Sequence, residues 1–172
     1  MRRLVIAVLV ALALLVPAGA QTKPFQLALV SPVQLVPPEQ SISGLRLSLI
    51  YGENRDVTGL DIGLAGRTTG DFLGVQVSVV SLVDGECVGW QHGGFYSRVA
   101  GTLTGAQSAF VTQAHDATGI QWGFVNLAGE MTGLQIGFFN QAQRLHGLQL
   151  GLLNIARNAG GHPVLVLVNW AS

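Results

Sequence analysis

Acidic side chains recur in the sequence at positions that suit a hard metal cation. Each stands three residues before a glycine, and the set is Asp56, Asp71, Glu86, Asp116 and Glu130. Carboxylate oxygens are the ligands that Ca²⁺ prefers, and stacked turns would align them along one edge. The alternative is a row of solvated turn residues, because like charges ~4.8 Å apart in water repel by only about 1 kcal/mol. We favour this alternative and expect no bound metal, because the glycine-rich nonapeptide of calcium-binding repeats is missing.

A second candidate is a polar pair in an otherwise apolar pattern. His92 and Ser108 occupy equivalent positions in successive glycine-led segments, and Trp90 and Trp122 lie nearby in register. Such a break could mark a ligand cleft. A histidine hydrogen-bonded to its neighbour's hydroxyl would equally form a satisfied interior pair, which is the interpretation we favour. Without an acidic orienting residue or oxyanion donors, the pair is weak evidence for hydrolysis.

The remaining reactive side chains are isolated. Cys87 shares its position with Val57, Phe72 and Leu103, so it is expected to be a small buried residue rather than a nucleophile. The other histidines have no metal-ligand spacing, which argues against zinc. We therefore expect neither an enzyme nor a cofactor.

The elements that carry these residues repeat every 14 to 16 positions. The repeat is led by Gly44, Gly59, Gly74, Gly89, Gly105, Gly119, Gly133 and Gly147. A fixed period of this kind indicates one small unit copied along the chain, with neighbouring copies burying each other's apolar faces.

Alignment on these glycines gives alternating columns. The first and third positions after the glycine are apolar and the second is mostly an amide, which predicts a half-buried strand. The fifth and sixth positions, both apolar as in Phe138-Phe139, are expected to bend toward the core. We expect the amide column to face outward and to bind a partner through Gln76, Gln91, Gln107, Gln121, Gln135 and Gln149.

Two all-β folds accommodate this repeat. The first is a parallel β-solenoid of about eight rungs of 14–16 residues with capping strands, in which like residues stack ~4.8 Å apart. The alternative is an up-and-down outer-membrane β-barrel, whose strands also alternate with period two. We favour the solenoid, because the alternating stretch is short and a barrel would place Phe139 and Leu153 in a polar lumen.

The ends of the chain differ from the repeats. Residues 1–20 have the charged, apolar and small-residue order of a signal peptide. Residues 21–43 predict an N-terminal strand and a Pro-rich loop, residues 44–160 the repeat domain, and residues 161–172 a closing strand. The chain has one lysine, and without residues 1–20 its formal charge is 7 − 9 = −2. Nucleic acid is therefore not an expected partner, because phosphate binding requires clustered cations.

Three repeats resemble a known group of proteins. The segments Gly119-Ile-Gln-Trp-Gly-Phe-Val-Asn126, Gly133-Leu-Gln-Ile-Gly-Phe-Phe-Asn140 and Gly147-Leu-Gln-Leu-Gly-Leu-Leu-Asn154 are similar to the units of the bacterial "surface repeat" proteins. The resemblance covers about residues 25–170 and implies an exported envelope or surface protein, often lipid-anchored. This chain lacks a lipobox cysteine, and the family supplies no catalytic residues.

The sequence therefore predicts an exported, non-enzymatic protein in the periplasm, at the outer membrane or on the cell surface. It would bind a partner or act as a scaffold through a rigid strand surface, with membrane association or self-association as possible modes. The alternative function is a small integral outer-membrane barrel, acting as a pore or a structural protein.

Overall fold

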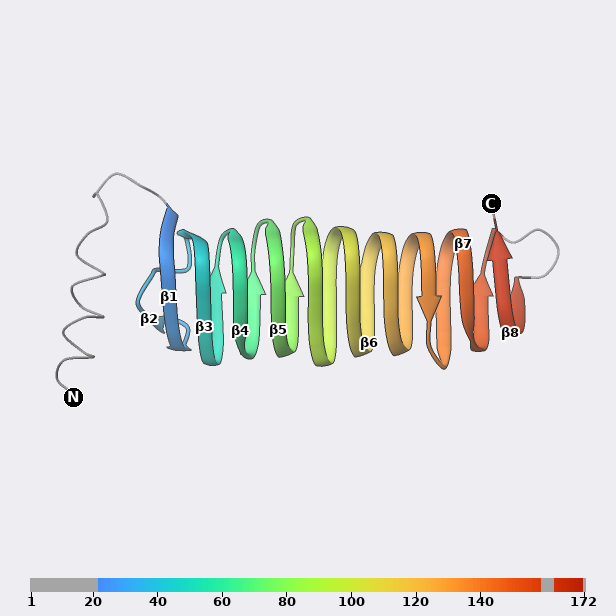
Figure 1. Ribbon diagram of the computed structural model, residues 1–172, viewed down its shortest axis with the longest axis horizontal. Coiled ribbons are helices and arrows are strands. Elements are labelled where there is room, and N and C mark those ends of the chain that lie inside the picture. The colour runs from blue at the N-terminus through green and yellow to red at the C-terminus, as the bar shows by residue number, and fades with distance from the viewer. Residues whose placement is uncertain (1–21, 159–162, 172) are drawn as a thin grey trace.

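The computed structural model describes residues 22–158 and 163–171, which form an elongated coil of stacked strands (Figure 1). The predicted signal peptide, residues 1–20, lies outside the described residues. The strands are β1 (Thr22–Val30), β2 (Val33–Gln34), β3 (Ser41–Asn54), β4 (Val57–Thr68), β5 (Phe72–Val83), β6 (Cys87–Ile136), β7 (Phe139–Ala156) and β8 (Val164–Ala171). No helix in the described part of the chain is long and apolar enough to span a membrane.

The strands join one sheet in the order β2-β1-β3-β4-β5-β6-β7-β8. Consecutive turns pair in parallel and in register, for example Gly44 with Gly59 and Gly59 with Gly74. β2 and β8 pair antiparallel at the two ends. The molecule is thus a parallel β-solenoid of about nine turns, and the barrel alternative is wrong. Stacking satisfies the backbone between successive turns, so the sheet winds into a coil with two ends instead of closing on itself.

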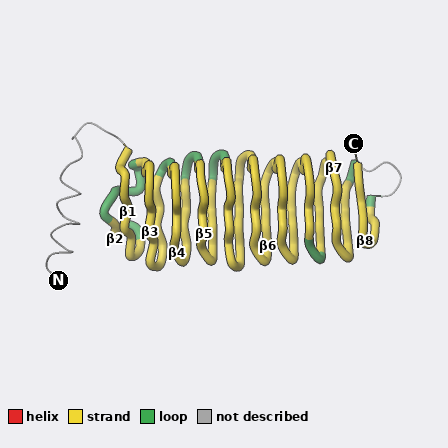
Figure 2. The backbone as a smooth tube through the Cα atoms, viewed as in Figure 1, coloured by secondary structure: helices red, strands yellow, loops and turns green. Residues whose placement is uncertain are grey.

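Each turn is a flattened loop with two walls, which Figure 2 shows as strand joined by short bends. We call the wall that carries residues 57–63 in β4 the first wall, and the wall that carries residues 65–68 the second wall. The predicted core column is buried and includes Val57, Phe72, Cys87, Leu103, Met131 and Leu145. It forms one cluster with the buried alanines Ala114, Ala128, Ala142 and Ala156. In the later turns, large core side chains of the first wall therefore pack against alanines of the second wall.

The leading glycines are required by close contact between turns. Gly133 has φ +127°, and a Cβ atom there would lie 2.2 Å from the carbonyl oxygen of Gly119. Only glycine adopts this backbone conformation readily and leaves room for the neighbouring carbonyl. The repeat period seen in the sequence is therefore set by this stacking contact.

Candidate functional site

The glutamine column lies inside the coil, which corrects the prediction that it binds a partner. Gln76, Gln91, Gln107, Gln121, Gln135 and Gln149 are all at most 1% exposed. Nε2 of each residue from Gln91 onward donates to Oε1 of the preceding one, over 2.7–3.0 Å. The same Nε2 atoms donate to backbone carbonyls such as that of Ile155, at 3.1 Å from Gln149. The amides satisfy one another and are not accessible to a partner.

A buried ion pair begins this glutamine ladder. Arg46 donates through Nε and Nη2 to the two carboxylate oxygens of Asp61, at 2.8 and 2.7 Å, and both side chains are at most 1% exposed. Gln76 Nε2 donates to Asp61 Oδ2 at 2.7 Å. An ionised carboxylate only accepts, so it fixes the direction in which every amide of the ladder points. Asn169 Nδ2 donates to Gln149 Oε1 at 3.2 Å and ends the ladder in β8.

An asparagine ladder runs the opposite way in the last turns. Asn126 Nδ2 donates to Asn140 Oδ1 at 2.7 Å, and Asn140 Nδ2 donates to Asn154 Oδ1 at 2.8 Å. Glutamine donors point to the preceding turn and asparagine donors to the following one. These asparagines were expected only as corner residues. Their exact 14-residue spacing was the signal for a buried ladder.

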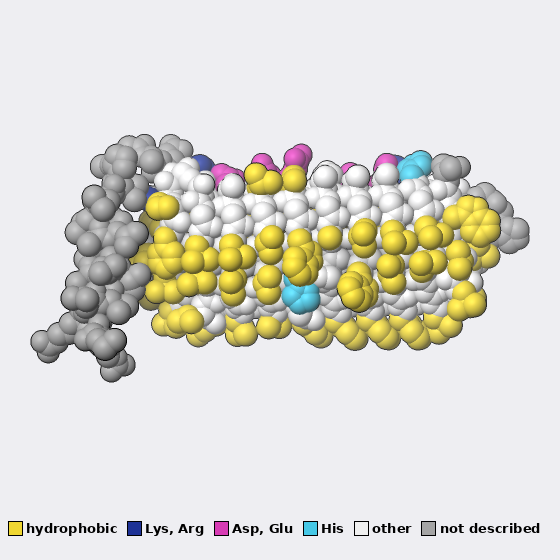
Figure 3. Space-filling model, viewed as in Figure 1, with side chains coloured by type: hydrophobic (Ala, Val, Ile, Leu, Met, Phe, Trp, Pro, Cys, Tyr) yellow, Lys and Arg dark blue, Asp and Glu magenta, His cyan; other side chains and the backbone are white. Residues whose placement is uncertain are grey.

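The apolar columns of the first wall face outward. We call this surface the apolar face, and it extends from β1 to β8 as two rows in Figure 3. Its first row is Phe25, Leu45, Leu60, Val75, Trp90, Ala106, Ile120, Leu134, Leu148 and Trp170, and its second row is Leu27, Leu47, Ile62, Val77, His92, Ser108, Trp122, Ile136, Leu150 and Val168. None of these side chains is an aspartate, glutamate, lysine or arginine. Trp122 and Trp170 are 67% and 68% exposed.

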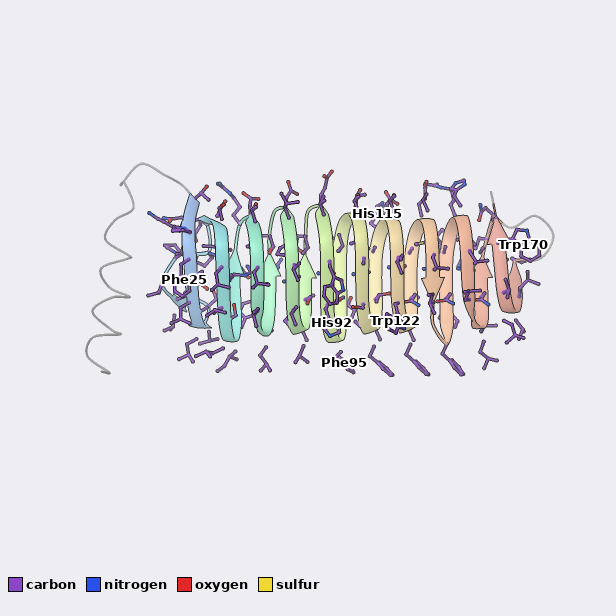
Figure 4. The ribbon with its side chains drawn as sticks, viewed as in Figure 1. Phe25, His92, Phe95, His115, Trp122 and Trp170 are labelled. Atoms are coloured by element: carbon purple, nitrogen blue, oxygen red, sulfur yellow. The ribbon has the colours of Figure 1, made fainter. Side chains whose placement is uncertain are left out.

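A row of phenylalanines forms the bend beside the apolar face. Phe95, Phe110, Phe124 and Phe138 stack with ring centroids 6.0, 5.0 and 4.8 Å apart and planes within 6° of parallel. All four are about half exposed or more. The fifth and sixth positions after the glycine, which include these four rings, were expected to turn into the core, and for the phenylalanines that prediction is wrong. Figure 4 shows this row projecting from the edge of the coil where Phe95 is labelled.

His92 and Ser108 do meet, but on the apolar face rather than in the interior. Ser108 Oγ lies 2.8 Å from His92 Nδ1, and the Trp90 indole N–H donates to the same oxygen at 3.2 Å. Both residues of the pair are half-buried. In the described part of the chain no carboxylate hydrogen-bonds to His92, so the pair lacks the orienting acid of a hydrolytic triad.

The acidic residues lie along the edge opposite the phenylalanine row, where Figure 3 shows acidic side chains projecting. Asp56 Oδ1 accepts from the backbone N–H of Asp71 at 3.1 Å, and Asp71 Oδ1 accepts from that of Glu86 at 2.8 Å. Arg144 donates to Glu130 at 2.6 Å and lowers the pKa of its carboxyl. Across residues 22–158 and 163–171, no three His, Cys, Asp or Glu side chains lie close enough to hold a metal. The structure therefore gives the calcium hypothesis no support.

The second wall exposes both charged and amide side chains. Arg67 donates to Asp84 at 2.7 Å, and Arg98 lies 3.8 Å from the same carboxylate. A hollow of about 390 Å³ lies on this wall and is lined by Arg98, Gln113, His115 and Gln141, among others. The outer surfaces of the two walls thus differ sharply, since that of the second wall is mixed and polar whereas the apolar face of the first wall has no charged side chain.

The chain matches no protein-family model, no curated protein and no solved structure.

Proposed function

We propose that this protein is an exported, non-enzymatic scaffold of the cell envelope that works by binding through its apolar face. The observation that carries the proposal is the absence of charge along this face, from Phe25 to Trp170. Contiguous exposed apolar patches larger than a few hundred Å² mark interaction sites in soluble proteins. The signal-peptide pattern of residues 1–20 and the resemblance to surface repeat proteins support export.

The rigidity of the coil suits recognition by a preformed surface. The glutamine ladder joins successive turns by side-chain hydrogen bonds, in addition to the parallel backbone pairing. A surface that is ordered before binding loses little conformational entropy when a partner docks. The face is therefore suited to a large, flat apolar partner rather than to a small ligand in a pocket.

The proposal can be tested in cells with charge placed on either wall. The face variant is Leu60→Asp with Ile120→Asp, and its matched control is Gln113→Asp with Gln143→Asp on exposed second-wall positions. We expect the wild type and the control to pellet with the envelope and the face variant to be released. An unchanged distribution of the face variant would contradict the proposal. Loss of export on removal of residues 1–20 tests the location separately.

A further inference from the structure

We propose that the partner of the apolar face is a second copy of this chain, bound face to face and antiparallel, with Trp122 of each copy over Ser108 of the other. This inference rests on the proposed function, since it names the partner of the same surface. It is carried by the size of the face, by the relief of its side chains and by the pairing of its polar groups.

The size of the face matches a stable dimer. The overlap described below covers about eight strands at ~4.8 Å. Its width is about six residues at ~3.3 Å when the outward positions on either side of the two rows are included, which gives a flat area of about 760 Å² per copy. A standard-size protein interface buries about 800 Å² on each partner. Two copies would therefore cover nearly the whole apolar face of each other.

The relief of the face indicates how the copies would align. Trp122 is 67% exposed, and the preceding turn carries only the short side chains of Ala106 and Ser108 in the two rows. The Trp90 indole reaches this turn from the other side, where its N–H donates to Ser108 Oγ, so a ring of the other copy entering there would pack beside Trp90. Figure 4 shows His92 and Trp122 on either side of this turn. A projecting ring beside a low turn is self-complementary if the two turns exchange places between copies.

One symmetry operation achieves this exchange. A two-fold axis in the interface, parallel to the strands and between the turns of Ser108 and Trp122, keeps each row opposite itself and reverses the order of turns. Trp122 then lies over Ser108 of the other copy. The same operation places Val77 opposite Leu150 and Leu60 opposite Trp170.

The hydroxyl at the centre of the face, that of Ser108, already has its hydrogen-bond partners within one copy. Trp90 donates to Ser108 Oγ, and the Ser108 hydroxyl can donate to His92 Nδ1, so that hydroxyl is already hydrogen-bonded within one copy. No charged side chain of the face would be desolvated, which removes the largest penalty on burial. A lipid surface would exploit neither the low turn nor this pairing, because acyl chains conform to any relief.

The first test is the mass of the purified mature protein by sedimentation equilibrium, with and without Trp122→Asp. We expect the wild type to have twice the mass of one chain and Trp122→Asp to dissociate at least tenfold more readily. Gln143→Asp is the matched control and should remain dimeric. Circular dichroism establishes that each variant keeps its β structure. A monomeric wild type would overturn the inference. Flotation of that monomer with phosphatidylcholine vesicles would indicate a lipid surface as the partner instead.

The second test fixes the orientation by disulfide cross-linking. Val77→Cys and Leu150→Cys are made as separate variants, and the native Cys87 is fully buried. We expect rapid cross-linking only when the two variants are mixed and re-equilibrated. Cross-linking of Val77→Cys with itself would indicate parallel copies and overturn the antiparallel arrangement. The two proposals can fail separately. If the protein is monomeric but the face variant is still released from the envelope, the dimer is refuted and the proposed function is retained.

Discussion

Gln149 and Gln135 are both fully buried, and Nε2 of the first donates to Oε1 of the second at 2.7 Å. This contact is one step of a ladder that crosses the solenoid from Asp61 to Asn169. An amide inside a protein is tolerated only when its donors and acceptors are satisfied. Stacking identical residues in register meets this requirement in every turn.

The ladder should be sensitive to the loss of a single member. Gln121→Leu leaves Gln107 Oε1 without its donor and Gln135 Nε2 without its acceptor. Since each unsatisfied buried polar group costs about 1–3 kcal/mol, we expect the free energy of unfolding to fall by about 2–4 kcal/mol. Urea denaturation followed by circular dichroism measures this change. Gln143→Leu, at an exposed position, is the control and should change stability by no more than about 0.5 kcal/mol. Equal effects of the two would contradict a buried ladder.

Two further glutamines should be able to replace the ion pair that begins the ladder. Asp61→Ala leaves the guanidinium of Arg46 buried without its partner, and such a change costs about 3–5 kcal/mol. The double variant Arg46→Gln with Asp61→Gln would continue the amide column by two turns. We therefore expect the double variant to be more stable than Asp61→Ala in the same urea titration. If the double variant is the less stable of the two, the ladder does not extend as the geometry implies.

The stacking glycines should not accept a side chain. Gly133→Ala would place a Cβ atom 2.2 Å from the Gly119 carbonyl oxygen at φ +127°, so we expect a loss of about 3 kcal/mol or more. Gly94 is the matched control, because the nearest atom to a Cβ there lies 3.7 Å away. Thermal unfolding should separate the two variants clearly. A Gly133→Ala protein as stable as Gly94→Ala would show that the turns are not packed this closely.

Cys87 should make stability depend on pH in the alkaline range. Burial raises the pKa of its thiol to about 12, whereas the thiol of the unfolded chain ionises near pH 8.5. Between these values only the unfolded state loses the proton, so stability is retained below pH ~8.5 and falls by about 1.4 kcal/mol per pH unit above it. Comparison of unfolding from pH 7 to 11 in the wild type and Cys87→Ala isolates this slope. Identical slopes in the two proteins would refute the assignment.

The solenoid could be predicted because the leading glycines recur every 14 to 16 residues even where the other positions of the repeats differ. The sequence did not show which of the two alternating sets of side chains in the first wall points inward. Both the amide column and the apolar columns alternate with period two, and inverting the wall exchanges core and surface. The common preference for burying apolar residues favoured Leu60 and Ile120 as the inner set, yet both are exposed.

The reason for this inversion lies between turns rather than within one. A single glutamine would be costly inside the coil, whereas Gln107, Gln121 and Gln135 satisfy one another once they are stacked. Sequence reasoning that treats each repeat separately does not include this cooperative term. The pairing of His92 with Ser108 could be predicted because it depends only on adjacent turns in register. Its location on the apolar face depends on which set of side chains points inward, so the sequence analysis placed it wrongly in the interior.

The central claim is that the amides lie inside and the apolar columns outside. Hydrogen exchange of the glutamine side-chain amides, followed by NMR, tests it directly and does not depend on oligomeric state. We predict that the Nε2 protons of Gln107, Gln121 and Gln135 exchange at least about a hundredfold more slowly than those of the exposed Gln143, because exchange requires the turns to open. Exchange of all four at the same rate would contradict the account.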